Sequence, residues 1–203
     1  MPLFKEWNPG LHSLAAIWHI TEPEAFFLEK VQPGSSIRND KRRIEHLAGR
    51  YLLQYLKADF PLHAIVPNEQ DKPVLPDASM HFSVSHSYPY AAALIHSREP
   101  VGIDLQCWHE RILKIQDKFL SPEEQNICGK SPEEVTLAWC AKEAAYKFHG
   151  QRGVDFIAHL PISSWQKDEG IYHMSINIKP TDLRYNLSLN GFIFNDFALS
   201  LTE

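Results

Sequence analysis

The sequence predicts an α+β fold, because each half of the chain combines one long helix with several strands. Apolar residues recur at helical spacing after residue 39 and again after residue 131. The last third alternates apolar and polar residues, which is typical of antiparallel strands. Together these patterns favour helices packed on antiparallel sheet.

The first half is expected to begin with a strand and two helices. "IWHITE" (17–22) indicates a strand, and "PEAFFLEKV" (23–31) a short helix. The clearest helix spans 39–60, with Asn39 or Asp40 as its cap. Its apolar positions are Ile44, Leu47, Ala48, Tyr51, Leu52 and Tyr55.

The middle of the chain indicates a loop followed by strands. A stretch rich in proline and aspartate (67–81) precedes the strand "FSVSHS" (82–87). The apolar runs 90–97 and 101–106 are joined by "REP", so we predict that they form a hairpin.

The second half opens with helical segments. "RILKIQDKFL" (111–120) has an apolar stripe, and two "SPEE" tetrapeptides follow at Ser121 and Ser131. Each offers a serine cap, a proline and then a glutamate, which is the capping-box pattern of a helix start. The second of these helices is expected to end at Gly150. Strands are predicted at 173–178, 185–189 and 191–201.

Composition narrows the class of protein. The 203 residues can bury a sizeable core, and the net charge of −5 argues against general nucleic-acid binding. Three cysteines without a C-x-x-C pair argue against a disulfide scaffold. With no secretory signal and no apolar run of membrane-spanning length, a cytoplasmic protein is expected.

The strand "VGIDLQ" carries a carboxylate and an amide on one face, since a period of two sends Asp104 and Gln106 to the same side. In the later helix "WCAKEAAYKFHG", Glu143 and Lys147 form an i,i+4 pair, which alone is typical of a solvated face. Alternatively, Asp104 and Glu143 converge on one Mg²⁺, which favours one or two carboxylates with waters and phosphate oxygens. Lys142 and Lys147 would then face the phosphates.

A basic cluster opens the long helix of the first half. Arg43, His46 and Arg50 fall on one flank at spacings of three and four. In an acidic protein such a flank indicates either a solvated helix face or a site for an anion such as phosphate. His86 in "SVSHS" can bind phosphate, act in catalysis or fill a turn.

Five segments in register resemble the phosphopantetheinyl transferases of the surfactin-synthetase-activating type. They are "DKPVLP", "FSVSHS", "VGIDLQ", "KFLSPEE" and "WCAKEAAYKFHG", in this order between residues 71 and 150. The last, with its W-x-x-K-E-x-x-x-K spacing, is the most specific.

The resemblance implies an Mg²⁺-dependent enzyme that moves 4′-phosphopantetheine from coenzyme A to a serine of an apo acyl or peptidyl carrier protein. Adenosine 3′,5′-bisphosphate would be released. It also implies two similar α+β halves, here 1–99 and 100–203, related by a pseudo-twofold axis with coenzyme A between them. Such a single chain is expected to be a monomer.

The resemblance also implies roles for individual residues. Asp104 and Glu143 would ligate Mg²⁺, and Glu143 would take the serine proton. Lys142 and Lys147 would pair with the pyrophosphate, with Lys147 steadying the leaving bisphosphate.

A second group of residues would hold the nucleotide. Arg50, His86 and Arg43, or a neighbour of Arg43 in the same basic run, would hold the 3′-phosphate. Lys72 and Ser85 would help to clamp the nucleotide.

Gln106 departs from the family pattern, which usually has a metal-binding glutamate there. Either Gln106 lends an amide oxygen to a weaker metal site, or the protein binds coenzyme A or a carrier without turnover. A nucleic-acid-binding protein is a third hypothesis, which the basic run suggests and the net charge opposes.

Overall fold

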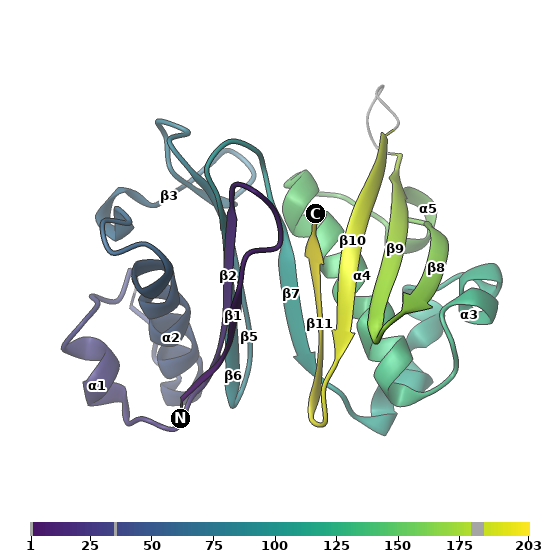
Figure 1. Ribbon diagram of the computed structural model, residues 1–203, viewed down its shortest axis with the longest axis horizontal. Helices are drawn as coiled ribbons and strands as arrows, with labels where there is room; N and C mark the ends of the chain where they lie inside the picture. The colour runs from purple at the N-terminus through teal and green to yellow at the C-terminus, as the bar shows by residue number, and fades with distance from the viewer. Residues whose placement is uncertain (1, 35, 180–184) are drawn as a thin grey trace. The chain divides into compact units, whose positions relative to one another are not determined.

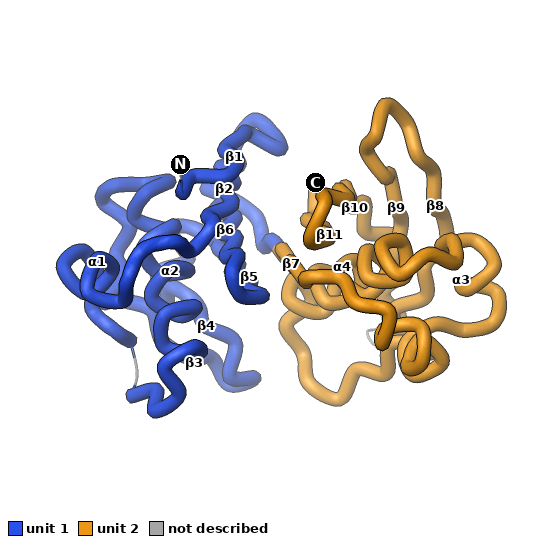
Figure 2. The backbone as a smooth tube through the Cα atoms, turned by 90° about the horizontal axis from the view of Figure 1, so that it is seen from below, with its two compact units in different colours: residues 1–101 blue, residues 102–203 orange. Residues whose placement is uncertain are grey.

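The computed structural model describes residues 2–34, 36–179 and 185–203, and the chain divides into two compact units (Figures 1 and 2). Unit 1 is Met1–Val101 and unit 2 is Gly102–Glu203. Each unit packs one long helix against an antiparallel sheet, as the sequence predicts.

Unit 1 contains a four-stranded sheet in the order β1-β2-β6-β5. Its strands are β1 (Leu3–Trp7), β2 (Ser13–His19), β5 (His81–Ser87) and β6 (Tyr90–His96), and a separate pair is formed by β3 (Val66–Pro67) and β4 (Pro73–Val74). Its helices are α1 (Glu24–Leu28), α2 (Asp40–Leu56) and the short 3-10 helix η1 (Leu62–Ala64).

Helix α2 covers one face of this sheet (Figure 1). The Asn39 side chain accepts a hydrogen bond from the backbone N–H of Arg42 at 2.9 Å, which confirms the predicted cap. Alanines on β6 leave room for the helix to approach the sheet. The buried contact set includes Leu47, Ala48, Leu52, Leu53, Ala91, Ala93 and Ile95.

Unit 2 contains a five-stranded antiparallel sheet in the order β7-β11-β10-β9-β8. Its strands are β7 (Ile103–Cys107), β8 (Ile162–Asp168), β9 (Ile171–Ile178), β10 (Tyr185–Ile193) and β11 (Phe197–Thr202). Its α-helices are α3 (Pro122–Ile127), α4 (Pro132–His149) and α5 (Phe156–His159).

Both predicted serine caps of unit 2 are confirmed. Ser121 forms a complete capping box with Glu124 at the start of α3, and Ser131 caps α4. Helix α4 ends at Gly150, whose φ of 70° is the left-handed conformation that glycine adopts at low cost.

The predicted hairpin between 90–97 and 101–106 is wrong. Strand β6 pairs with β2 and β5 in unit 1, whereas β7 pairs with β11 in unit 2. The "REP" segment therefore connects the two sheets along the chain instead of turning between paired strands.

The predicted helix at 111–120 is also wrong. This segment forms two short 3-10 helices, η2 (Glu110–Lys114) and η3 (Gln116–Lys118), and neither contains a buried residue. Ile115, a member of the expected apolar stripe, is 41% exposed. Phe119 is buried and Ile112 packs against the core, so the stripe is buried only in part and gives a short α-helix little packing to stabilise it.

Among the described residues, no helix combines the length and the apolar character needed to cross a membrane.

Candidate active site

Gly102 brings strand β7 into direct contact with helix α4. A Cβ atom added to Gly102 would lie 1.9 Å from the carbonyl oxygen of Ala144 and 2.9 Å from the backbone nitrogen of Phe148. Only glycine can approach a helix backbone so closely. The strand that carries Asp104 therefore begins against the helix that carries Glu143.

Asp104 faces α4 and is 6% exposed. Lys147 Nζ lies 2.7 Å from Asp104 Oδ1 and also donates to the carbonyl oxygen of Ile103 at 3.0 Å. The ammonium group thus neutralises the charge of a carboxylate that is almost removed from water.

Glu143 lies one turn before Lys147 on α4, and its pKa is influenced by the charge of Asp104. The pKa of Glu143 is raised to about 7, first by burial and then by the negative charge of Asp104, while the positive charge of Lys147 lowers it in part. Two carboxylates therefore share one lysine. The structure brings Asp104, Glu143 and Lys147 together, as the sequence predicts.

These residues fit a hard divalent cation. Mg²⁺ is commonly held by one or two carboxylates, with waters and substrate phosphates as its other ligands. Within the described ranges, no cluster of three or more His, Cys, Asp or Glu side chains could hold a metal. Asp104 and Glu143 would thus supply the protein carboxylates, and the rest would come from substrate, water or the Gln106 amide.

The pKa of Glu143 predicts that the metal-free protein loses stability as the pH rises from about 4.5 to about 7. In this window the native state keeps a proton on Glu143 that the unfolded chain releases, so the native state binds more protons. One pKa unit corresponds to about 1.4 kcal/mol, so a shift from 4.5 to about 7 makes the loss about 3 kcal/mol. Urea unfolding at both ends of this range should show it for the wild type and not for Glu143→Gln. Parallel pH profiles for the two proteins would contradict the prediction.

Gln106 lies on the same face of β7 as Asp104. The two residues pair with Ala198 and Ser200 of β11 without a register shift, which confirms the predicted alternation. The Gln106 side chain donates from Nε2 to the carbonyl oxygen of Cys107 at 3.2 Å. This bond turns the amide nitrogen toward its own strand.

The prediction for Lys142 is wrong in this structure, because its side chain is 0% exposed. Its Nζ lies 2.6 Å from Glu124 Oε1 and donates to the carbonyl oxygen of Phe156 at 2.8 Å. The ammonium group is thus held inside unit 2, and a phosphate would have to break a buried ion pair to reach it. The sequence alone could not distinguish a buried lysine from an exposed one here, because Lys142 has an apolar neighbour in Ala141 and a charged one in Glu143.

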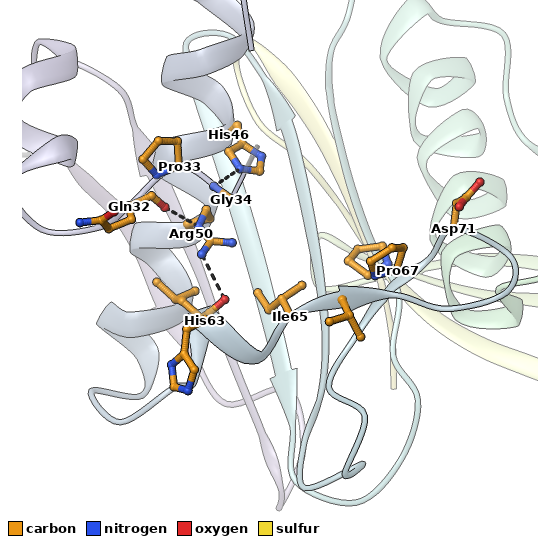
Figure 3. A pocket seen from close by; sticks show the side chains of 12 residues that line it. Gln32, Pro33, Gly34, His46, Arg50, His63, Ile65, Pro67 and Asp71 are labelled. Atoms are coloured by element: carbon orange, nitrogen blue, oxygen red, sulfur yellow. Dashed lines mark hydrogen bonds between the residues drawn. The ribbon is translucent and has the colours of Figure 1, made fainter. Parts of the chain in front are cut away.

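Unit 1 carries a second candidate site, a pocket of about 370 Å³ that Arg50 and His46 line (Figure 3). Arg50 donates from Nε to the carbonyl oxygen of Gln32 at 2.8 Å and from Nη2 to that of Leu62 at 3.1 Å. These bonds fix the guanidinium group at the pocket wall. Figure 3 shows it beside the His46 ring, which accepts from the Gly34 N–H at 3.4 Å.

The positive groups around this pocket favour an anion. Burial lowers the pKa of His46, and the charges of Arg50 and His86 lower it further. Burial also lowers the pKa of Arg50. A bound phosphate would offset this repulsion among cationic groups.

His86 is oriented by an acid that the sequence did not single out. Glu45 is buried, its Oε1 accepts from the backbone N–H of Tyr88 at 2.9 Å, and its Oε2 lies 3.4 Å from His86 Nδ1. The signal in the sequence is an acidic residue beside apolar Ile44 on the inner side of α2, where a charge needs a partner.

Arg43, which is predicted to bind the ligand, is paired within unit 1 in this structure. Arg43 donates from Nη2 to Glu24 at 2.8 Å and to Asp40 at 3.0 Å, and from Nη1 to the carbonyl oxygen of Ile37 at 3.1 Å. The guanidinium group is therefore committed to bonds that join α1 and α2. Its neighbour Lys41 is exposed instead, with Nζ 5.2 Å from the centre of the Tyr88 ring.

Ser85 and Lys72, the two further residues that are predicted to clamp the nucleotide, lie on β5 and beside β4. Ser85 is buried on the face of the sheet opposite to His86, since adjacent residues of β5 alternate. Lys72 is half-buried in the turn between β3 and β4, and its charge contributes to the lowered pKa of His81. Asp71 and Pro73, the residues on either side of Lys72 in the sequence, both line the pocket.

Comparisons with known proteins agree with this arrangement. The family model of the 4′-phosphopantetheinyl transferase superfamily matches residues 100–202, which contain Asp104, Glu143 and Lys147. Enterobactin synthase component D of Escherichia coli is 34% identical over 145 residues, covering 66% of this chain and 67% of that protein. A 4′-phosphopantetheinyl transferase of Bacillus subtilis is 33% identical over 114 residues, covering 52% and 46%. The transferase gsp of Aneurinibacillus migulanus is 29% identical over 130 residues, covering 62% and 52%.

These findings define a transferase that activates carrier proteins. The chain belongs to the 4′-phosphopantetheinyl transferase superfamily.

Proposed function

We propose that this enzyme transfers 4′-phosphopantetheine from coenzyme A to a serine hydroxyl of an apo acyl or peptidyl carrier protein, with Mg²⁺. The observation that carries the proposal is the convergence of Asp104, Glu143 and Lys147 inside the segment that the superfamily matches. In this reaction a bond forms between the serine oxygen and the phosphorus of phosphopantetheine. The bond from that phosphorus to the bridging oxygen breaks, and adenosine 3′,5′-bisphosphate leaves with the electron pair.

Asp104, Glu143 and Lys147, here called the acidic cluster, each have a distinct role. Glu143 accepts the serine proton, since it is the carboxylate that α4 presents beside Asp104 and Lys147. Lys147 pairs with Asp104 and offers positive charge to the oxygens of the leaving bisphosphate. Asp104 and Glu143 would hold Mg²⁺, which neutralises charge on the transferred phosphoryl group when bound.

The nucleotide is assigned to the pocket of unit 1. Arg50 at its wall supplies the positive charge that a nucleotide phosphate requires, and the rings of His46 at the wall and His86 nearby can take up a proton when the phosphate binds. The pseudo-twofold relation of the halves, the position of coenzyme A between them and a monomeric state remain predictions from the resemblance.

The test is incubation with coenzyme A, Mg²⁺ and a panel of apo carrier proteins, read by intact mass. Carriers should gain the mass of one phosphopantetheine, and a carrier with its serine replaced by alanine should not. Coenzyme A binding without any mass gain would favour the alternative, a binding protein without turnover. Nucleic-acid binding is opposed by the intramolecular pairing of Arg43 within the basic run.

Gln106→Glu should lower the Mg²⁺ concentration that gives half-maximal activity. A third carboxylate beside Asp104 and Glu143 adds negative charge and so raises affinity for a divalent cation. A severalfold decrease is expected from Mg²⁺ titrations of initial rate, with Gln106→Leu as the control of similar size. An unchanged requirement in Gln106→Glu would count against a metal role for this position.

Lys41, rather than Arg43, should distinguish coenzyme A from 3′-dephospho-coenzyme A. Lys41 is exposed beside Tyr88, two residues from His86, whereas Arg43 is held by Glu24. A bond to a charged group contributes about 1.5–3 kcal/mol, so Lys41→Ala should raise the KM for coenzyme A about tenfold. The KM for the dephospho form should change little. Loss of discrimination in Arg43→Ala alone would overturn this assignment.

A further inference from the structure

The buried ion pair between Lys142 and Glu124 joins the two sequence segments "SPEE" and "WCAKE". Glu124 is 3% exposed and uses both carboxylate oxygens. Oε2 accepts from the Ser121 N–H at 2.7 Å, and Oε1 accepts from the Ile162 N–H at 2.8 Å and from Lys142. One carboxylate therefore ties the start of α3, the start of β8 and the middle of α4 together.

Lys142 directly precedes Glu143 on α4, and Lys147 follows five positions later. Successive side chains on an α-helix are separated by about 100° around its axis, because the helix has 3.6 residues per turn. Anchoring Lys142 on the side of α4 that meets α3 and β8 therefore fixes which way Glu143 and Lys147 point. Both project toward Asp104 on β7, on a different side of the helix.

We propose that Lys142 and Glu124 are positioning residues, which set the rotation of α4 so that Glu143 stands opposite Asp104. The inference rests on the proposed function of the acidic cluster. It reassigns Lys142 from contact with the substrate to orientation of its neighbour. It also gives the first "SPEE" segment a part in the active site that helix capping alone does not explain.

The buried charges make single substitutions costly. Removing one partner of a buried ion pair is strongly destabilising, whereas replacing both partners is often nearly neutral. Glu124→Gln keeps an acceptor oxygen for the backbone. The double variant Lys142→Met with Glu124→Gln leaves no buried charge at this place and is the version that should remain folded.

The test compares Glu124→Gln, the double variant and Leu137→Ala at a temperature at which circular dichroism shows each to be folded. Leu137 lies on the same helix and is fully buried, so its truncation lowers stability without removing either partner of the ion pair. Misplacement of reacting groups by about 1 Å can cost about 100-fold in rate. We expect kcat to fall about 10- to 100-fold in both Glu124 variants, with the KM for coenzyme A changed less than twofold. Leu137→Ala should keep kcat within about threefold.

A binding measurement separates this inference from the proposed function. Mn²⁺ affinity, read by electron paramagnetic resonance without carrier protein, should fall about fivefold or more in both Glu124 variants and stay unchanged in Leu137→Ala. Wild-type kcat and Mn²⁺ affinity in folded Glu124→Gln would overturn the proposal. So would a loss confined to the KM for coenzyme A in the double variant, because that result would place Lys142 on the substrate. A wild-type protein that binds Mn²⁺ but loads no carrier would overturn the proposed function, and the Mn²⁺ comparison would still test the positioning role.

Discussion

Glu143→Ala should lower kcat for carrier modification by about 10³-fold, because a general base and a charge-stabilising ligand are lost together. Stability should not fall with activity. The burial and the negative charge of Asp104 that raise the pKa of Glu143 make its ionised form unfavourable in the metal-free protein. The measurement is the rate of mass gain on an apo carrier at saturating coenzyme A and Mg²⁺, with thermal unfolding recorded in parallel.

Glu133→Ala is the matched control, since Glu133 lies in the first turn of the same helix, away from Asp104. It should retain near wild-type kcat. A Glu143→Ala enzyme that still loads the carrier at near wild-type rate would refute the role of this carboxylate. A loss of activity accompanied by unfolding would refute the argument from its pKa.

Gly102→Ala should have the largest effect on stability. The added methyl group would lie 1.9 Å from the Ala144 carbonyl oxygen, and backbone atoms of α4 cannot move aside as a flexible side chain can. Overpacking of a core costs about 1–3 kcal/mol and sometimes more, so a loss of about 3 kcal/mol or more is expected. The displaced strand should also separate Asp104 from Glu143. Urea unfolding measures the loss of stability. The rate of carrier loading reports the effect of separating Asp104 from Glu143.

Gly49→Ala is the control variant, and it should not lower the stability of the protein. Gly49 lies inside helix α2, and a Cβ there would meet Val84 at 3.7 Å, an ordinary contact. Because alanine favours a helix over glycine by about 1 kcal/mol, this variant should be as stable as the wild type or more stable. Equal stability losses in the two variants would show that the close approach at Gly102 is not what matters.

The sequence predicts the elements of this fold better than their pairing. Helix α4 could be located because Ser131 and Gly150 mark its two ends by local rules that act within a few residues. The partner of β7 could not be predicted, because β11 lies almost a hundred residues later and any apolar strand could have taken its place. The predicted hairpin is wrong because β6 and β7, which are consecutive in the sequence, belong to different sheets.

The same distinction applies to the site. Asp104, Glu143 and Lys147 could be predicted because a strand period and a helix spacing determine which way their side chains point. Lys142 and Arg43 could not be placed, because their roles depend on Glu124 and Glu24, which distant segments supply. A positively charged residue in a motif does not by itself show whether its partner is the substrate, another part of the protein or water.

The division of the chain after Val101 has a consequence for recombination. The phosphate-binding candidates Arg50, His46 and His86 lie before this junction, and Asp104, Glu143 and Lys147 lie after it. A crossover between two related genes at the codon for residue 101 would thus inherit nucleotide recognition from one parent and phosphoryl chemistry from the other. Chimeras made at this junction would show which parent determines the preference for coenzyme A over its analogues. Asp104, Glu143 and Lys147 would all come from the same parent.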